Sequence, residues 1–209
     1  MPMVDQLSCV WLLTPPTATN DGNRHFSSDA FDTELATFLQ ECVTTGRRDV
    51  REFANYMRTR HARYLSYGDQ ASSYFTTTNR STYFDFIPSA ALTRSVVFFD
   101  PDNGLEPRTV VTAAHLKYSE LQTVFNRMDD CSIAVIYQHS ARQPRDVFWP
   151  SIADRVRISL KASVGYLESG DVGFFIVLRN QDASQFASAA LRHVQQRWPT
   201  KVLVANPGR

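Results

Sequence analysis

The sequence predicts an α/β fold, a Rossmann-like three-layer sandwich with a mostly parallel sheet and one antiparallel hairpin near the C-terminus. Continuously apolar runs, such as residues 95–99 and 132–137, alternate with stretches of helical periodicity. Strands that are apolar throughout are typical of parallel sheets covered by helices on both faces. The runs at 164–168 and 172–178 flank a Ser-Gly-Asp turn, which predicts the hairpin.

Up to residue 94 the pattern is irregular. Apolar spacing and turn residues predict the following elements: a strand at 9–13 closed by Thr-Pro-Pro, a helix capped by Ser28 or Asp29 and ended by Gly46, a helix from Arg47 to about Tyr64, a strand at 72–78, and a short helix at 82–92 interrupted at Pro88.

From residue 95 onward the pattern is regular. It predicts strands at 95–99 and 132–137, a helix at 118–128, a helix at 146–161 with Val147, Ile152, Val156 and Leu160 inward, the hairpin, a last helix with Phe186, Ala190, Val194 and Trp198 inward, and a final strand at 201–205. We expect a single domain over residues 1–209, because no linker or repeat divides the chain.

Composition narrows the classes of function. The 209 residues are 43% hydrophobic with a formal net charge of +1, which is ordinary for a globular domain and gives no overall attraction to nucleic acid or membrane. Cys9, Cys42 and Cys131 are unclustered, which favours reduced, buried thiols over disulfides or a zinc site. Since no apolar run approaches about 18 residues and no export signal is evident, we expect a cytoplasmic protein without a membrane partner.

Polar residues follow three of the predicted strands. In open α/β sheets ligands bind beyond the carboxyl ends of the strands, so such residues are candidates for a site. They are Asn20 and Asp21 after the first strand, Asp100, Asp102, Asn103 and Glu106 after the strand at 95–99, and Gln138, His139 and Arg142 after the strand at 132–137. If the three strands are neighbours, these clusters converge at one edge of the sheet.

The loop Asp100-Pro-Asp-Asn-Gly-Leu-Glu106 is the most specific of these clusters. Asp100 and Asp102 present two carboxylates from a stiff turn, which suits a hard cation such as Mg²⁺ or Mn²⁺. The functional interpretation makes both aspartates metal ligands and lets Glu106 or His139 activate water. The alternative is that these residues form a good turn sequence whose acids cap backbone amides.

Other residues have candidate roles in binding substrate. His139 is a candidate general acid or base, or a metal ligand, with Arg142 and Arg145 holding a phosphate; the alternative is a histidine at a strand end whose ring is satisfied by backbone groups. Asn20, Asp21, Asn103, Lys117 and Gln138 complete the candidate substrate-binding set. Lys117 could instead be a solvated lysine at the start of a helix.

Arginines on the second predicted helix suggest a nucleic-acid interface. Arg47, Arg51 and Arg58 fall on one face of that helix, opposite Phe53 and Met57. Such a stripe could follow a phosphate backbone, or it could be an ordinary solvated face.

The chain has no G-x-G-x-x-G, Walker A or G-x-S-x-G motif and no paired Cys/His zinc spacing. Ser95-Val-Val-Phe-Phe-Asp-Pro-Asp102 resembles the fourth motif of amino-directed methyltransferases that depend on S-adenosylmethionine (SAM), where a strand leads into Asp-Pro-Pro-aromatic. The later order of elements resembles the C-terminal half of this Rossmann-like family. The resemblance implies SAM as cofactor and Asp100 in the loop that holds the target amine. Asp102 and Asn103 depart from the motif, and no glycine-rich loop follows Leu13.

The loop from Asp100 to Glu106, with Tyr137-Gln-His139 and Asn20-Asp-Gly22, also resembles a group of uncharacterised bacterial α/β proteins. That resemblance implies a shared site but names no substrate. We therefore expect a metal-dependent enzyme, like a hydrolase or nuclease, that acts on a phosphate-containing small molecule or nucleic acid. The alternatives are a methyltransferase-like modifier of nucleic acid and a non-catalytic nucleic-acid-binding or adaptor protein that uses the arginine face.

Overall fold

The structure is a computed structural model that describes residues 4–15, 32–47, 49–70, 74–140, 143–199 and 202–208. Its elements, in chain order, are β1 (Gln6–Leu12), α1 (Thr33–Thr44), α2 (Glu52–Thr59), β2 (Tyr64–Tyr67), α3 (Arg80–Tyr83), the short 3₁₀ turns η2 (Phe84–Phe86) and η3 (Ser89–Leu92), β3 (Ser95–Pro101), α4 (Tyr118–Arg127), β4 (Ile133–His139), α5 (Arg145–Leu160), β5 (Ser163–Ser169), β6 (Val172–Leu178), α6 (Gln181–Arg197) and β7 (Leu203–Gly208).

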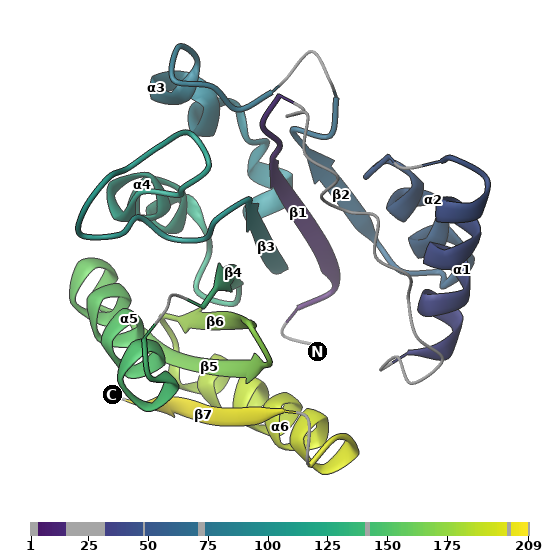
Figure 1. Cartoon of the computed structure of the whole chain (residues 1–209). Helices are drawn as coiled ribbons and strands as arrows, with labels where there is room; N and C mark the ends of the chain where they lie inside the picture. The colour runs from purple at the N-terminus through teal and green to yellow at the C-terminus, as the bar shows by residue number, and fades with distance from the viewer. Residues whose placement is uncertain are drawn as a thin grey trace.

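Seven strands form one sheet in the order β2-β1-β3-β4-β6-β5-β7 (Figure 1). The first four are parallel, and β6, β5 and β7 each run antiparallel to the strand before them in this order. The predicted α/β class with a mostly parallel core is confirmed. The antiparallel part is larger than one hairpin, because β6 also pairs with β4 and β7 pairs with β5. The tight turn between β5 and β6 leaves no room for a crossover, so β6 must reverse direction.

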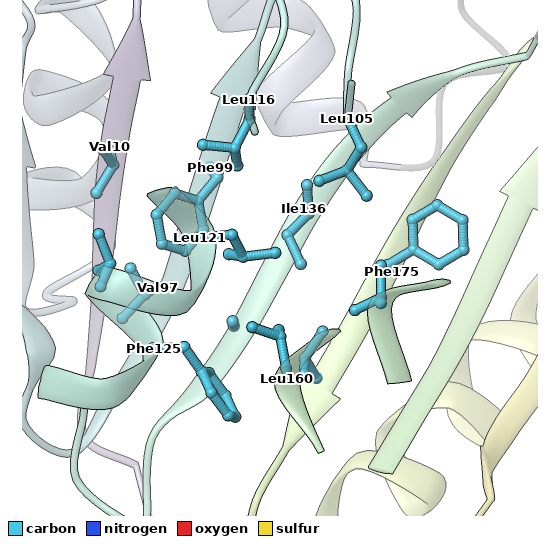
Figure 2. Packing of buried hydrophobic residues seen from close by; sticks show 14 of the residues in the cluster. Val10, Val97, Phe99, Leu105, Leu116, Leu121, Phe125, Ile136, Leu160 and Phe175 are labelled. Carbon is cyan, nitrogen blue, oxygen red and sulfur yellow. The ribbon is translucent and has the colours of Figure 1, made fainter. Parts of the chain in front are cut away.

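One face of the sheet carries the main hydrophobic core, and we call it the α4 face. Four buried strand residues in lateral register point to it, namely Val10, Phe99, Ile136 and Phe175. They belong to one cluster with Leu121 and Phe125 of α4 and Leu160 of α5 (Figure 2). Burial of this apolar surface fixes α4 and α5 against the sheet.

The opposite face, which we call the α6 face, is covered in two places. Ile133 and Ile176 pack with Ala187 and Leu191 of α6 in a second cluster. At the β2 edge of the sheet, Phe53 of α2 meets the ring of Tyr64 at 5.5 Å, and α1 packs on α2 through Phe38 and Tyr56. Helices therefore lie on both faces of the sheet (Figure 1).

Helix α2 corrects the sequence prediction most strongly. A helix was predicted from Arg47 to about Tyr64, but α2 spans only Glu52–Thr59, and Tyr64–Tyr67 forms β2. His61 adopts a left-handed φ of 52°, which turns the chain between the two elements. Tyr64 continues the helical spacing of apolar residues, but the pairing of β2 with β1 makes this segment a strand.

Smaller predictions were also wrong. Residues 74–78, the described part of the predicted strand 72–78, form a turn that the Asn79 side chain ties to Tyr74 and Thr76. In α6 the buried residues include Ala187 and Leu191, whereas Phe186 is 45% exposed, so the inward stripe lies one position further along. Val147 of α5 is exposed rather than inward.

The predicted caps Ser28 and Asp29 lie outside the described residues, and α1 is capped by Asp32, whose carboxylate accepts the Leu35 N–H. The three cysteines are free, with Cys131 only half-buried. Among the helices that the structure describes, none is long and apolar enough to cross a membrane.

Candidate functional site at the carboxyl edge of the sheet

β1, β3 and β4 are parallel neighbours, so their carboxyl ends open onto the same edge of the sheet. β3 ends in Asp100 and Pro101, with Asp102 in the turn that follows, and β4 ends in Gln138 and His139. The sheet order thus brings two of the predicted clusters together. Asn20, Asp21 and Arg142, which were predicted at the same edge, lie outside the described residues.

The chain leaves β1 and β3 toward opposite faces of the sheet. The connection after β1 carries α2, whose Phe53 packs on Tyr64, on the α6 face. The connection after β3 carries α4, whose Leu121 lies in the core of the α4 face. Where the connections of neighbouring strands diverge, an open α/β sheet leaves a crevice that binds ligands. In this sheet the rule predicts the ligand position beyond Leu12 and Pro101, which face each other in register.

Asp100 and Asp102, which we call the acid pair, lie at this position. Asp100 is half-buried and stands opposite Trp11 of β1. The hydroxyl of Thr14, two residues beyond β1, donates to Oδ2 of Asp102. Burial raises the pKa of Asp100 to about 6, and the negative charge of Asp102 adds to this rise. A partly buried carboxylate next to a second carboxylate favours the binding of a proton or of a cation, because either one reduces the negative charge.

The donors of the acid pair suit some cations better than others. Within the described ranges, no three His, Cys, Asp or Glu side chains gather into a metal-ligand set. Structural zinc sites use four protein ligands and Ca²⁺ takes about six to eight oxygens. Mg²⁺ binds through one or two carboxylates and keeps water or substrate phosphate oxygens as its remaining ligands. The acid pair therefore fits Mg²⁺, or the similar Mn²⁺, used together with an oxygen-rich substrate.

His139 is exposed at the end of β4, and Tyr137 fixes the orientation of its ring. The Tyr137 hydroxyl and Nε2 of His139 are 2.8 Å apart, and the two rings meet edge to face at 5.0 Å. The pairing of β3 with β4 ends at Phe99 opposite Ile136, and Asp100 and Tyr137 are the next residues of the two strands. Tyr137 thus holds the imidazole at the carboxyl end of β4, the strand next to β3.

Gln138 holds the loop that follows the acid pair. Its Oε1 accepts the N–H of Leu105 at 2.8 Å, and its Nε2 donates to the carbonyl of His139 at 2.8 Å. Gly104 has a φ of +87°, and a Cβ there would lie 2.6 Å from the Gln138 amide. A side chain at residue 104 would therefore be strained by the backbone conformation and would force the Gln138 amide to move. Gln138 accordingly shapes the site besides lining it.

Glu106 and Lys117 both lie at the start of α4. The carboxylate of Glu106 accepts the N–H of Tyr118 at 2.8 Å, and Glu120 accepts the N–H of Lys117 at 2.9 Å. The buried guanidinium of Arg80 also pairs with Glu120. The predicted alternative, in which an acid of the loop caps a backbone amide, thus holds for Glu106.

A cleft of about 630 Å³ opens at the same edge of the sheet. It is lined by Asn103, Leu105, Pro107, Arg108, Thr109, His115, Gln138, His139, Ser140, Gln143, Val147, Phe148, Ser151, Ile152 and Arg155. The residues therefore come from the loop between β3 and α4, the end of β4 with Ser140 and Gln143 beyond it, and one side of α5. Two guanidinium groups and two imidazoles are among them, and none of the lining residues is acidic.

Asn103, Gln138 and His139 of this cleft were predicted as site residues, whereas Arg108, His115 and Arg155 were not. Arg155 was not predicted because its helix was recognised from its apolar residues alone, and nothing distinguished Arg155 from the other polar residues on it. One sequence feature could have indicated Arg155. It lies three residues after Ile152 and four after Ser151, which places all three on one side of α5.

The arginine face predicted over residues 47–58 does not form. Arg47 and Arg51 precede α2, and of the three arginines only Arg58 lies within the helix. Arg47 pairs with Glu52 at 3.1 Å, and Arg51 pairs with Asp49. The prediction required one continuous helix from Arg47, and because α2 begins at Glu52 with Arg51 as its N-cap, Arg47 lies outside that helix.

No protein-family model matches the chain, and no curated protein gives a significant match to its sequence. Function is therefore inferred from the chemistry of the site.

Proposed function

We propose that the protein is a metal-dependent enzyme that acts on a phosphate-containing substrate, a nucleotide or nucleic acid, in the manner of a hydrolase or nuclease. The observation that carries the proposal is the acid pair at the carboxyl ends of β1 and β3, in which Asp100 is half-buried and Asp102 is exposed. A ligand-binding position of the fold, a raised pKa at Asp100 and a two-carboxylate donor set support the same interpretation.

Asp100 and Asp102 would hold Mg²⁺ or Mn²⁺, and Thr14 would keep the Asp102 carboxylate in place. Such an ion, when bound, offsets negative charge that develops on phosphoryl oxygens. His139 is the proposed base. If Nε2–H donates to the Tyr137 oxygen, the lone pair of the neutral ring lies on Nδ1, which is then the atom that takes a proton from water. Glu106 has no chemical role in this proposal, because its carboxylate caps α4.

The test is turnover of bis(p-nitrophenyl) phosphate and of a panel of nucleotides and oligonucleotides with Mg²⁺ or Mn²⁺ added. Asp102→Asn keeps an oxygen that can accept the Thr14 hydrogen bond but removes a charge, so we expect activity to fall by a factor of about 100 or more. Its melting temperature should change little. The matched control is Asp154→Asn, an exposed acid of α5 that pairs with Arg157. Full turnover in Asp102→Asn would refute the proposal.

A second candidate, a methyltransferase-like modifier of nucleic acid, is favoured by the strand order. Reversed strand β6 lies between β4 and β5, which run in the same direction, and this agrees with the resemblance to the C-terminal half of SAM-dependent methyltransferases. Asp100 also ends β3 as the fourth motif of that family requires. However, no glycine occurs between Leu13 and Asp21, so the residues after β1 do not fit a SAM loop. Calorimetric binding of SAM at micromolar concentration would favour this candidate over the metal-dependent one.

A further inference from the structure

The cleft between α5 and the loop that connects β3 to α4 has the lining expected for an anion. Arg108, Arg155, His115 and His139 contribute to it, and no aspartate or glutamate does. Glu106, an acid of the loop whose charge acts on His115, has its carboxylate engaged at the N–H of Tyr118. The cleft is thus rich in hydrogen-bond donors and free of lining carboxylates that would repel a phosphate.

Arg155 is oriented by neutral groups. Its Nη2 donates to the backbone carbonyl of Glu106 at 3.0 Å, and its guanidinium lies 4.6 Å from the centre of the Tyr118 ring. Arg155 takes part in none of the ion pairs found among the described residues. A half-buried guanidinium held in this way keeps its charge and its other N–H donors for a ligand, and their planar arrangement matches phosphate oxygens.

His115 adds a neutral donor to the same cleft. Its Nδ1 accepts the backbone N–H of Thr112 at 3.2 Å, so the proton of the neutral ring lies on Nε2. Burial, and then the positive charge of Arg80, hold the pKa of His115 below its ordinary value. His115 therefore lines the cleft as an uncharged ring whose Nε2–H is a hydrogen-bond donor.

Arg108 lies close enough to Arg155 for their charges to act on the same group. Burial raises the pKa of Tyr118 to about 12; the positive charge of Arg155 opposes this rise, the negative charge of Glu106 adds to it, and the positive charge of Arg108 opposes it. Arg108 itself is exposed and makes no ion pair among the residues described. Two guanidinium groups without carboxylate partners thus lie near the Tyr118 hydroxyl.

We infer that this cleft binds a phosphate monoester of mononucleotide size, with the phosphate at Arg155, Arg108 and His115 and the rest of the ligand along Val147 and Ile152. A volume of about 630 Å³ is within the range of small-molecule sites. The inference goes beyond the proposed function and does not depend on it, because neither Asp100 nor Asp102 lines this cleft. It assigns the phosphate to residues that the acid pair does not include.

The test is calorimetric titration of the full chain with AMP, adenosine and inorganic phosphate in EDTA, so that no divalent cation contributes. We expect AMP to bind and adenosine to bind at least about tenfold more weakly, because adenosine lacks the charged group. Arg155→Met should weaken AMP binding by about tenfold or more. Arg157→Met removes the same charge from the same helix outside the cleft, and its affinity should stay within about twofold of the wild type. If Arg155→Met fails to fold, Arg108→Met provides the same comparison at an exposed residue.

Equal affinity for AMP in the wild type and in both cleft variants would overturn the inference, as would the absence of AMP binding at roughly 10 mM. A separate Mn²⁺ titration distinguishes this outcome from failure of the proposed function. AMP binding without any Mn²⁺ binding would leave the cleft assignment standing and remove the metal-dependent enzyme. Mn²⁺ binding at the acid pair without AMP binding would do the reverse.

Discussion

Asp100 of the acid pair has a pKa that its environment shifts away from the ordinary value of an aspartate. Burial, followed by the charge of Asp102, raises its pKa to about 6. An acid whose pKa is raised on folding binds more protons in the native state than in the unfolded state between the two values. Native stability therefore falls as pH rises from about 4 to about 6, and the loss persists above that range.

Replacing Asp100 by asparagine should remove this pH dependence. In EDTA we expect Asp100→Asn to become more stable relative to wild type as pH rises from about 4.5 to about 7.5, by at most roughly 3 kcal/mol. Urea unfolding at the two pH values measures the difference. Asp154→Asn, whose side chain is 62% exposed, should show no such trend. An unchanged difference between Asp100→Asn and wild type at both pH values would contradict the environment described for Asp100.

At the scale of elements, the turn after β3 depends on contact between Gly104 and Gln138. Gly104→Ala should destabilise the fold by about 1–3 kcal/mol more than Gly170→Ala. Both glycines have positive φ, but a Cβ at residue 170 meets no atom within 4 Å. In a Gln138→Ala background the extra cost of Gly104→Ala should disappear, which chemical denaturation of the double-mutant cycle measures. Equal costs at the two glycines would show that Gln138 exerts no steric constraint.

Some secondary-structure elements could be predicted from the sequence and others could not. β3 and β4 are long apolar runs, and the polar residues after them were predicted as candidates because such runs form buried strands. β2 was missed because Tyr64 continued a helical spacing, and only pairing with β1 makes that segment a strand. Arg155 and His115 were missed since they come from separate elements that meet only in the folded chain. A single sequence does not show which residues of separate elements lie close together in the fold.

At the scale of the whole molecule, both halves of the chain share one sheet. β1 pairs with β3 along its full length, from Gln6 opposite Ser95 to Leu12 opposite Pro101, and Val10 lies in the same core as Phe99. We therefore expect one cooperative unfolding transition in calorimetry, with agreement between calorimetric and van't Hoff enthalpies. Two resolved transitions, one of which survives removal of residues 1–94, would contradict a single-domain organisation.

The central functional claim is that the acid pair binds a divalent cation, and an Mn²⁺ titration followed by electron paramagnetic resonance tests it most directly. The signal of free Mn²⁺ should fall in proportion to wild-type protein until one site per chain is filled, and Asp154→Asn should behave identically. Asp100→Asn and Asp102→Asn should each leave the free Mn²⁺ signal almost unchanged at the same concentrations. Undiminished binding in both aspartate variants, or no binding by the wild type at about 1 mM Mn²⁺, would contradict the assignment of this pair as a metal site.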